Sequence, residues 1–201
     1  QFFAEGAYYG DFNRDGHLDV VAGPFWFAGP DFKQKHEYRP AHSFDPHGYS
    51  DNFLTYTADF NADGWADIFC VPFPGAEGYW YENPKDKAGA WPRHLAYSMV
   101  GNESPGWVDM NGDGREDLIF NNEGFLGYAT YDTAKPYEPW TFHAVSPRDG
   151  RFQRFTHGIG AGDINGDGKN DLVEAAGWWE QPKDGSTTRP WKFHPYKFAE
   201  A

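Results

Sequence analysis

One acidic motif of nine residues occurs four times along this chain of 201 residues. The copies share the pattern D-x-N-x-D-G-x-x-D and stand at 11–19, 59–67, 109–117 and 163–171. An interval of about 50 residues between copies is typical of chains built from repeated supersecondary units. The motif therefore predicts four copies of one structural unit rather than a single irregular core.

Short apolar and aromatic runs recur in the same order after each motif. The first run reads LDVVAG, ADIFCV, EDLIF or NDLVEAAG, and the second reads PFWFAGP, GYWYENP, FLGYATY or GWWEQP. Three units end in Trp-x-x-His, at 91–94, 140–143 and 191–194, and KQKH at 33–36 is the weaker first copy. Such short runs between turn residues favour strands. We predict an all-β chain with four antiparallel strands in each unit and unit boundaries near 1–46, 47–98, 99–147 and 148–201.

These units resemble FG-GAP/VCBS repeats over essentially the whole chain. The resemblance implies one β-propeller domain, 1–201, of the integrin type, in which each four-stranded blade carries a calcium loop between its first and second strands. Family members usually have more than four blades. The resemblance therefore favours a segment of a larger propeller, for example a seven-bladed one, over a closed ring of four blades.

The four motifs predict up to four bound Ca²⁺ ions. Calcium takes six to eight oxygen ligands, and alternate positions of a tight loop can direct side-chain oxygens at one centre. The alternative is a set of Asx-rich turns without metal. The expected side-chain ligands are Asp11, Asn13, Asp15 and Asp19; Asp59, Asn61, Asp63 and Asp67; Asp109, Asn111, Asp113 and Asp117; and Asp163, Asn165, Asp167 and Asp171. Backbone carbonyls of His17, Trp65, Arg115 and Lys169 complete the predicted sets.

The last loop also fits the calcium pattern of an EF-hand, because Glu174 stands at its final position. The sister loops have Ala22, Cys70 and Phe120 there, and strand-like rather than helical runs flank all four. We therefore expect calcium to tie blade hairpins together instead of driving a sensor. Cys70, the single cysteine, is expected to be a small core residue.

The charge balance restricts the class of partner. The formal net charge is -13, which opposes nucleic-acid binding. No apolar run is long enough to span a membrane, and no signal peptide is recognised in this chain. Because weak calcium sites fill where calcium is millimolar, we expect an extracytoplasmic protein, whether secreted, periplasmic or on the cell surface.

The remaining polar residues predict a ligand site in the loops between blades. His36, His94, His143 and His194 recur once per unit, which favours a structural role, and the aromatic clusters FWF, YWY and GWW are expected to pack between sheets rather than to bind sugar. By analogy of fold, loops at the mouth of a propeller channel bind ligands. The predicted ligand residues are His47, Ser50, Asp51, Asn52, Asn102, Glu103, Ser104, Arg154 and His157.

Three functions are compatible with such a site. The first is a module that binds a carbohydrate or a protein partner. The second is a carbohydrate lyase or dehydratase, for which His47, His157 and Glu103 are the candidate acid and base groups. The third is a structural or assembly role, in which further blades or a partner chain complete the propeller.

Overall fold

The computed structural model describes residues 3–85, 87, 89–187 and 190–199, so the ends of the predicted 1–201 domain lie outside the described residues. Within this part of the chain all regular elements are strands, β1 to β15, and none is a helix. No segment of it forms a helix of the length and apolar character that crossing a membrane requires. The expectation of an all-β fold is confirmed.

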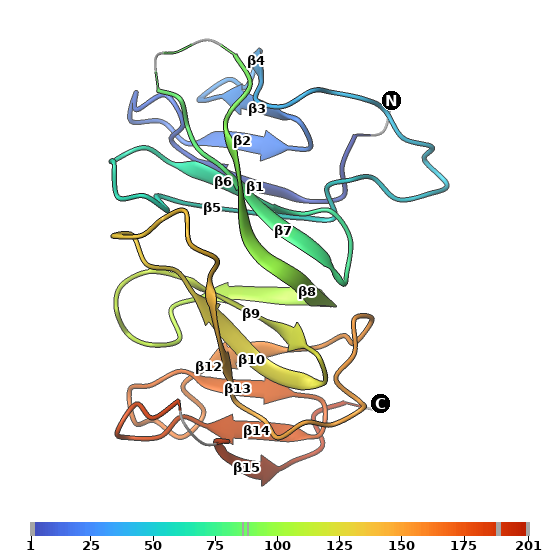
Figure 1. Ribbon diagram of the computed structural model, residues 1–201, viewed down its shortest axis with the longest axis vertical. Coiled ribbons are helices and arrows are strands. Elements are labelled where there is room, and N and C mark those ends of the chain that lie inside the picture. The colour runs from blue at the N-terminus through green and yellow to red at the C-terminus, as the bar shows by residue number, and fades with distance from the viewer. Residues whose placement is uncertain (1–2, 86, 88, 188–189, 200–201) are drawn as a thin grey trace. The chain divides into compact units, whose positions relative to one another are not determined.

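The strands form three antiparallel sheets (Figure 1). The first sheet follows the chain, with β1 (Ala7–Gly10), β2 (Asp19–Ala22), β3 (Phe25–Ala28) and β4 (Gln34–Glu37). The last sheet has the same order, with β12 (Gly160–Gly162), β13 (Asp171–Glu174), β14 (Gly177–Glu180) and β15 (Lys192–Pro195). Each of these two sheets is therefore an up-and-down meander of sequence neighbours.

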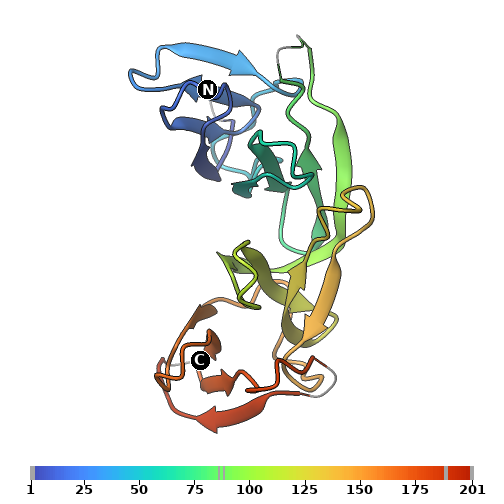
Figure 2. The same cartoon turned by 90° about the vertical axis from the view of Figure 1, so that its left-hand side faces the viewer.

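The seven-stranded sheet joins two further meanders through one long strand. Its members are β5 (Leu54–Ala58), β6 (Asp67–Val71), β7 (Ala76–Tyr81), β8 (Arg93–Val108), β9 (Asp117–Asn122), β10 (Phe125–Thr130) and β11 (Thr141–Ala144), in chain order across the sheet. Figure 2 shows β8 as a long green strand. Since β8 ends one meander and begins the next, 15 strands account for the four strands expected in each of four units.

The chain divides into two compact units. Unit 1 is Gln1–Met99 with Asp132–Pro139, and unit 2 is Val100–Tyr131 with Trp140–Ala201. Each unit holds two neighbouring copies of the sequence repeat and is described separately below.

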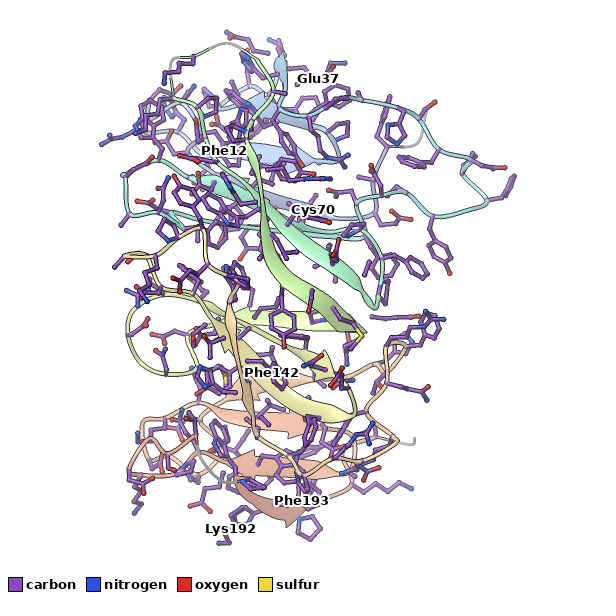
Figure 3. All side chains as sticks on the ribbon, in the orientation of Figure 1. Phe12, Glu37, Cys70, Phe142, Lys192 and Phe193 are labelled. Carbon is purple, nitrogen blue, oxygen red and sulfur yellow. The ribbon has the colours of Figure 1, made fainter. Side chains whose placement is uncertain are left out.

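The core of unit 1 lies between its two meanders. Phe12, Trp26 and Tyr38 from the first meander and its loops pack with Cys70 and Trp91 from the second. Phe12 follows β1, and Cys70 lies in β6, all five residues of which are buried (Figure 3). The backbone N–H of Trp91 donates to the carbonyl of Tyr38 at 2.8 Å, which joins the two meanders beside this core. The prediction that Cys70 is a core residue is confirmed.

Unit 2 repeats this arrangement with different side chains. Met110, Tyr128 and Val145 pack with Leu172 and Trp191 in its core. The backbone N–H of Trp191 donates to the carbonyl of Val145 at 2.8 Å, in the place that Trp91 and Tyr38 hold in unit 1. The tryptophan of the Trp-x-x-His motif thus joins each pair of meanders.

The repeated histidines lie on the fourth strands and pack against aromatic rings of the third. His36 stacks on Trp26 with ring centroids 4.0 Å apart, and His194 stacks on Trp178 at 4.1 Å. In the other two copies His94 lies 4.5 Å from Trp80 and His143 lies 4.9 Å from Tyr128. The recurrence of one histidine in every copy is therefore explained by a cross-strand ring pair between the third and fourth strands.

Candidate functional site

The four acidic loops have one backbone conformation. In every copy the glycine at the sixth position has a left-handed φ, with values of 84° at Gly16, 86° at Gly64 and 84° at both Gly114 and Gly168. Glycine takes this region without the steric cost that a Cβ would impose. The loop shape is therefore encoded in the motif itself.

The first aspartate of each loop holds that shape through backbone N–H groups. Asp163 accepts from Gly166 at 2.7 Å and from Gly168 at 2.8 Å, and the bond from Gly168 is the main cause that lowers the pKa of Asp163. Asp59 accepts in the same way from Asp63 at 2.9 Å and Gly64 at 2.7 Å. The lowered pKa keeps Asp163 ionised at neutral pH, and both carboxylates cap their loops by accepting backbone N–H groups.

The ninth aspartate is buried and connects the loop to the sheet. Asp67 accepts from the N–H of Phe60 at 3.0 Å and from that of Asn83 at 2.8 Å. Asp171 accepts in the same manner from Ile164 at 3.0 Å and Gln181 at 2.9 Å. Asp67 and Asp171, like Asp19, therefore link the start of the loop to the segment after the third strand, a structural role in addition to the predicted one as metal ligands.

Burial also changes the protonation of these groups. It raises the pKa of Asp67 to about 8 and that of Asp117 to about 7, with the other loop aspartates adding to the shift. The physical cause is desolvation, which disfavours the charged carboxylate unless a cation compensates it. A cation close to these loops would therefore release protons near neutral pH.

The donor set of the loops suits a hard cation such as Ca²⁺. Alternate positions offer carboxylate and amide oxygens, and each carboxylate has about four lone-pair sites, so the backbone hydrogen bonds leave acceptor capacity. Among the described residues, no three His, Cys, Asp or Glu side chains already converge as a metal cluster. The type of donor, rather than an assembled cage, therefore supports calcium here.

In two of the loops a basic side chain forms a salt bridge with a loop aspartate. Lys85 Nζ lies 3.1 Å from Asp63 Oδ2, and Arg115 Nη2 lies 2.5 Å from Asp113 Oδ2. Both acids stand at the fifth position of their loops, where a metal ligand is expected. The loops at 59–67 and 109–117 are thus partly neutralised by side chains.

Side-chain amides fasten the loops of one meander to the next within each unit. In unit 1, Asn83 Nδ2 donates to the carbonyl of Phe12 at 2.9 Å and to that of Ala66 at 3.0 Å. In unit 2, Gln181 donates to the carbonyl of Met110, and Asn170 Nδ2 donates to that of Asp109 at 2.7 Å. The first loop of each unit is therefore fixed by the second meander, which a pattern read along the chain does not reveal.

The predicted ligand residues of unit 1 lie in the segment before β5. His47 is exposed, whereas Ser50 is buried and donates to Glu5 through its hydroxyl. Asn52 is buried as well, and its Nδ2 donates to the carbonyl of Gly6 at 3.0 Å. Asp51 is the partner of Arg39, with Nη1 to Oδ2 at 2.7 Å and Nη2 to Oδ1 at 2.8 Å.

The predicted ligand residues of unit 2 come together around one ion pair. His157 Nε2 lies 2.9 Å from Glu103 Oε2, and the backbone N–H of Gly158 donates to Ser104 Oγ at 3.1 Å. Asn102 has a left-handed φ of 81°, and its Oδ1 accepts from the N–H of Ser104 at 2.7 Å. Its Nδ2 is buried with no hydrogen-bond partner in the described part of the chain. The guanidinium of Arg154 lies over the ring of Phe155, 4.5 Å from its centroid.

A cavity of about 550 Å³ lies beside His157 in unit 2. Its polar lining includes Arg151 and Glu174, which pair at 2.8 Å between Nη2 and Oε1, and its apolar lining includes Phe152 and Ile159. The sequence marks Glu174 only as the final position of an EF-hand pattern, and it predicts no role for Arg151. Arg151 belongs to the polar segment RFQRFTHG at 151–158, whereas Glu174 lies in β13. Their pairing could not be predicted, because it depends on how β13 packs against that segment.

The comparisons with known proteins agree with this architecture. A family model described as an FG-GAP-like repeat matches residues 59–120. No curated protein matches the chain. Among solved structures, a lectin from Agrocybe aegerita, described as specifically recognising non-reducing terminal N-acetylglucosamine, aligns with a TM-score of 0.53 and 17% identity. The alignment covers 86% of this chain and 48% of the lectin chain, so this chain spans about half the length of its structural neighbour.

Proposed function

We propose that this FG-GAP repeat protein is a calcium-stabilised carbohydrate-binding module, and that the cavity beside His157 in unit 2 is its sugar site. The four meanders are blades of a propeller in this proposal. The observation that carries it is the lining of the cavity, in which His157 and the ion pair of Arg151 with Glu174 border the apolar side chains Phe152 and Ile159. Glu103, which does not line the cavity, holds the imidazole of His157 at 2.9 Å.

The chemistry of this lining suits a sugar. Hydroxyl groups of a saccharide need fixed donors and acceptors, while the C–H face of its ring packs on apolar and aromatic side chains. The cavity of about 550 Å³ falls in the range of small-molecule sites. The fold shared with a lectin that recognises terminal N-acetylglucosamine supports the same class of ligand.

Calcium has a structural task in this proposal. Bound at the loops, it would compensate the crowded carboxylates of the first, fifth and ninth positions and hold each hairpin closed. The residues themselves fix the loop through Asp-to-backbone hydrogen bonds, as at Asp163 and Asp67. Dependence on calcium is the reason to place the protein outside the cytoplasm, and a partner chain or further blades would complete the ring.

Sugar titrations with matched histidine variants test this function. We expect N-acetylglucosamine to bind the native protein in isothermal titration calorimetry, and His157→Ala to lower the affinity about tenfold or more, because a hydrogen-bonding group of the lining is removed. His47→Ala is the matched control, since His47 is exposed in unit 1. Equal affinity of both variants and the native protein for every neutral sugar tested would contradict the proposed site.

The pair of His157 and Glu103 also favours a second candidate, a carbohydrate lyase or dehydratase. A histidine 2.9 Å from a carboxylate can accept a proton while the carboxylate stabilises its charge. The same sugar incubations, analysed by mass spectrometry for loss of water or for unsaturated products, separate the two functions. Product formation that disappears in His157→Ala would assign the enzyme, whereas absence of both binding and turnover would favour assembly.

A further inference from the structure

A second cavity, about 460 Å³ in volume, lies in unit 1 and differs in chemistry from the cavity in unit 2. Its lining includes Arg39, His42, Asp51, Tyr79, Trp91 and Arg93. Two guanidinium groups therefore face one lining carboxylate, in a chain whose formal net charge is -13. A basic cavity lined by aromatic side chains favours a negatively charged ligand whose ring can pack on those side chains.

Arg39 is fixed in place before any ligand arrives. Its side chain is 9% exposed, and both of its terminal nitrogens bond to Asp51. Nε donates to the hydroxyl of Tyr38 at 3.4 Å. A guanidinium has five N–H donors, and these bonds use three of them, so two donors are left to a ligand as far as the described residues show. Rigid donors of this kind lower the entropic cost of binding.

Arg93 supplies the positive charge that is not neutralised. Its guanidinium lies 4.4 Å from the ring centroid of Tyr79, and within the described part of the chain it forms no salt bridge. Glu77 accepts a hydrogen bond from the hydroxyl of Tyr79 and is not part of the cavity lining. Arg93 is exposed, so it can turn towards a ligand at the mouth of the cavity.

We infer that this cavity binds an acidic saccharide, one whose ring carries a carboxylate. Arg93 binds the carboxylate, for which the planar guanidinium offers two parallel hydrogen bonds. The spare donors of Arg39 and the carboxylate of Asp51 bind ring hydroxyls, and Tyr79 and Trp91 pack on the ring. This site is separate from the sugar site proposed in unit 2 and does not depend on it.

Titration with two uronic acids and their neutral parents tests the inference. We expect glucuronate or galacturonate to bind the calcium-loaded protein, and glucose and galactose to bind at least about tenfold more weakly, because charge-assisted hydrogen bonds are lost. Arg93→Gln should reduce uronate affinity about tenfold. Lys35→Gln is the matched control, since it removes the same charge from unit 1 at a residue that lies over Phe25 and does not line this cavity.

The remaining outcomes decide against the inference or separate it from the proposed function. If Arg93→Gln and Lys35→Gln lowered the uronate affinity equally, the effect would come from net charge alone. If the neutral sugars bound as tightly as the uronates, the cavity would not recognise a carboxylate. Equal binding of glucose 6-sulfate would also overturn the carboxylate assignment. His157→Ala should leave uronate binding unchanged, and a loss there would move the anion to unit 2. Melting curves of each variant confirm that the fold is retained.

Discussion

Asn83 Nδ2 donates a 2.9 Å hydrogen bond to the carbonyl of Phe12, a residue that is 71 positions earlier in the chain. Phe12 is the second residue of the first acidic loop, and its own N–H donates to the buried Asp19 at 2.8 Å. One amide of the second meander therefore holds the loop of the first. The same relation recurs in unit 2 between Gln181 and Met110.

The first prediction concerns this hydrogen bond from the Asn83 amide to the first loop. Asn83→Ala removes the donor from the buried carbonyl of Phe12 and from the partly buried carbonyl of Ala66, and we expect the free energy of unfolding to fall by about 1–3 kcal/mol. Urea denaturation followed by tryptophan fluorescence measures the change. Gln34→Ala, at an exposed position of β4, is the control and should change the free energy of unfolding by less than about 0.5 kcal/mol. Equal effects of the two substitutions would show that the hydrogen bonds from Asn83 contribute no stability.

The second prediction concerns the affinity of individual loops for calcium. Lys85→Met and Arg115→Met remove the cations that pair with Asp63 and Asp113, so we expect each variant to bind Ca²⁺ more tightly than the native protein. Calorimetric titration of protein first stripped with EDTA measures the affinities. Lys35→Met, which removes a charge at a position that makes no ion pair with a loop acid among the described residues, should have a smaller effect. Weaker calcium binding in the first two variants would contradict the assignment of Asp63 and Asp113 as ligands.

The third prediction follows from the buried ninth aspartates. Because the folded-state pKa of Asp67 is about 8 and that of Asp117 is about 7, while both lie near 3.8 when unperturbed, the native state binds more protons than the unfolded state between these values. In the presence of EDTA, these groups should therefore make the free energy of unfolding fall as pH rises from about 4 to about 8.

Calcium should reverse this contribution, since it binds the ionised carboxylates and releases their protons. Urea denaturation at several pH values, with EDTA in one series and excess calcium in the other, measures both slopes. If the free energy of unfolding changed with pH at the same slope in both series, no ninth aspartate would be linked to calcium binding. Calorimetry in two buffers with different ionisation enthalpies gives an independent count of the released protons.

The fourth prediction concerns Cys70. Burial raises the pKa of this thiol to about 12, and its Sγ donates to Asn52 Oδ1 at 2.9 Å. Since the thiolate is the reactive form, Cys70 should resist iodoacetamide in the native protein and react once unit 1 opens in urea. Mass spectrometry of the labelled protein gives the reacted fraction. Rapid labelling without denaturant would contradict the packing of β6 in the core.

Much of the architecture follows from local pattern. Every repeat forms the same acidic loop, the same strand after it and the same kind of cross-strand ring pair, such as Trp26 with His36 and Trp178 with His194. These features recur in the sequence because each is built from contacts within one repeat. A glycine at the sixth position and an aspartate that caps its own loop act over a few residues. Such features are visible in one copy and are reinforced by comparison of four.

The residues that line the two cavities could be predicted less well, because they come from segments far apart in the sequence. Glu103 and His157 were both selected, but Arg151 with Glu174, and Arg39 with Arg93, were not, because each pair joins segments that differ between copies and meet only after the sheets pack. Ser50 and Asn52 were selected for their polarity, and the structure places them in buried hydrogen bonds to Glu5 and Gly6. Polarity alone does not distinguish a residue that faces a ligand from one that satisfies the backbone.

The sequence by itself determined the all-β class, the repeat of about 50 residues and the chemistry of the acidic loops, since these depend on periodicity and on turn residues close together in the chain. The tertiary structure decided the second role of the ninth aspartates, the hydrogen bonds from Asn83 and Gln181 to the first loop of each unit, and the two cavities with their different linings. These features arise from contacts between meanders, where burial and desolvation, rather than local propensity, set the position and charge of each side chain.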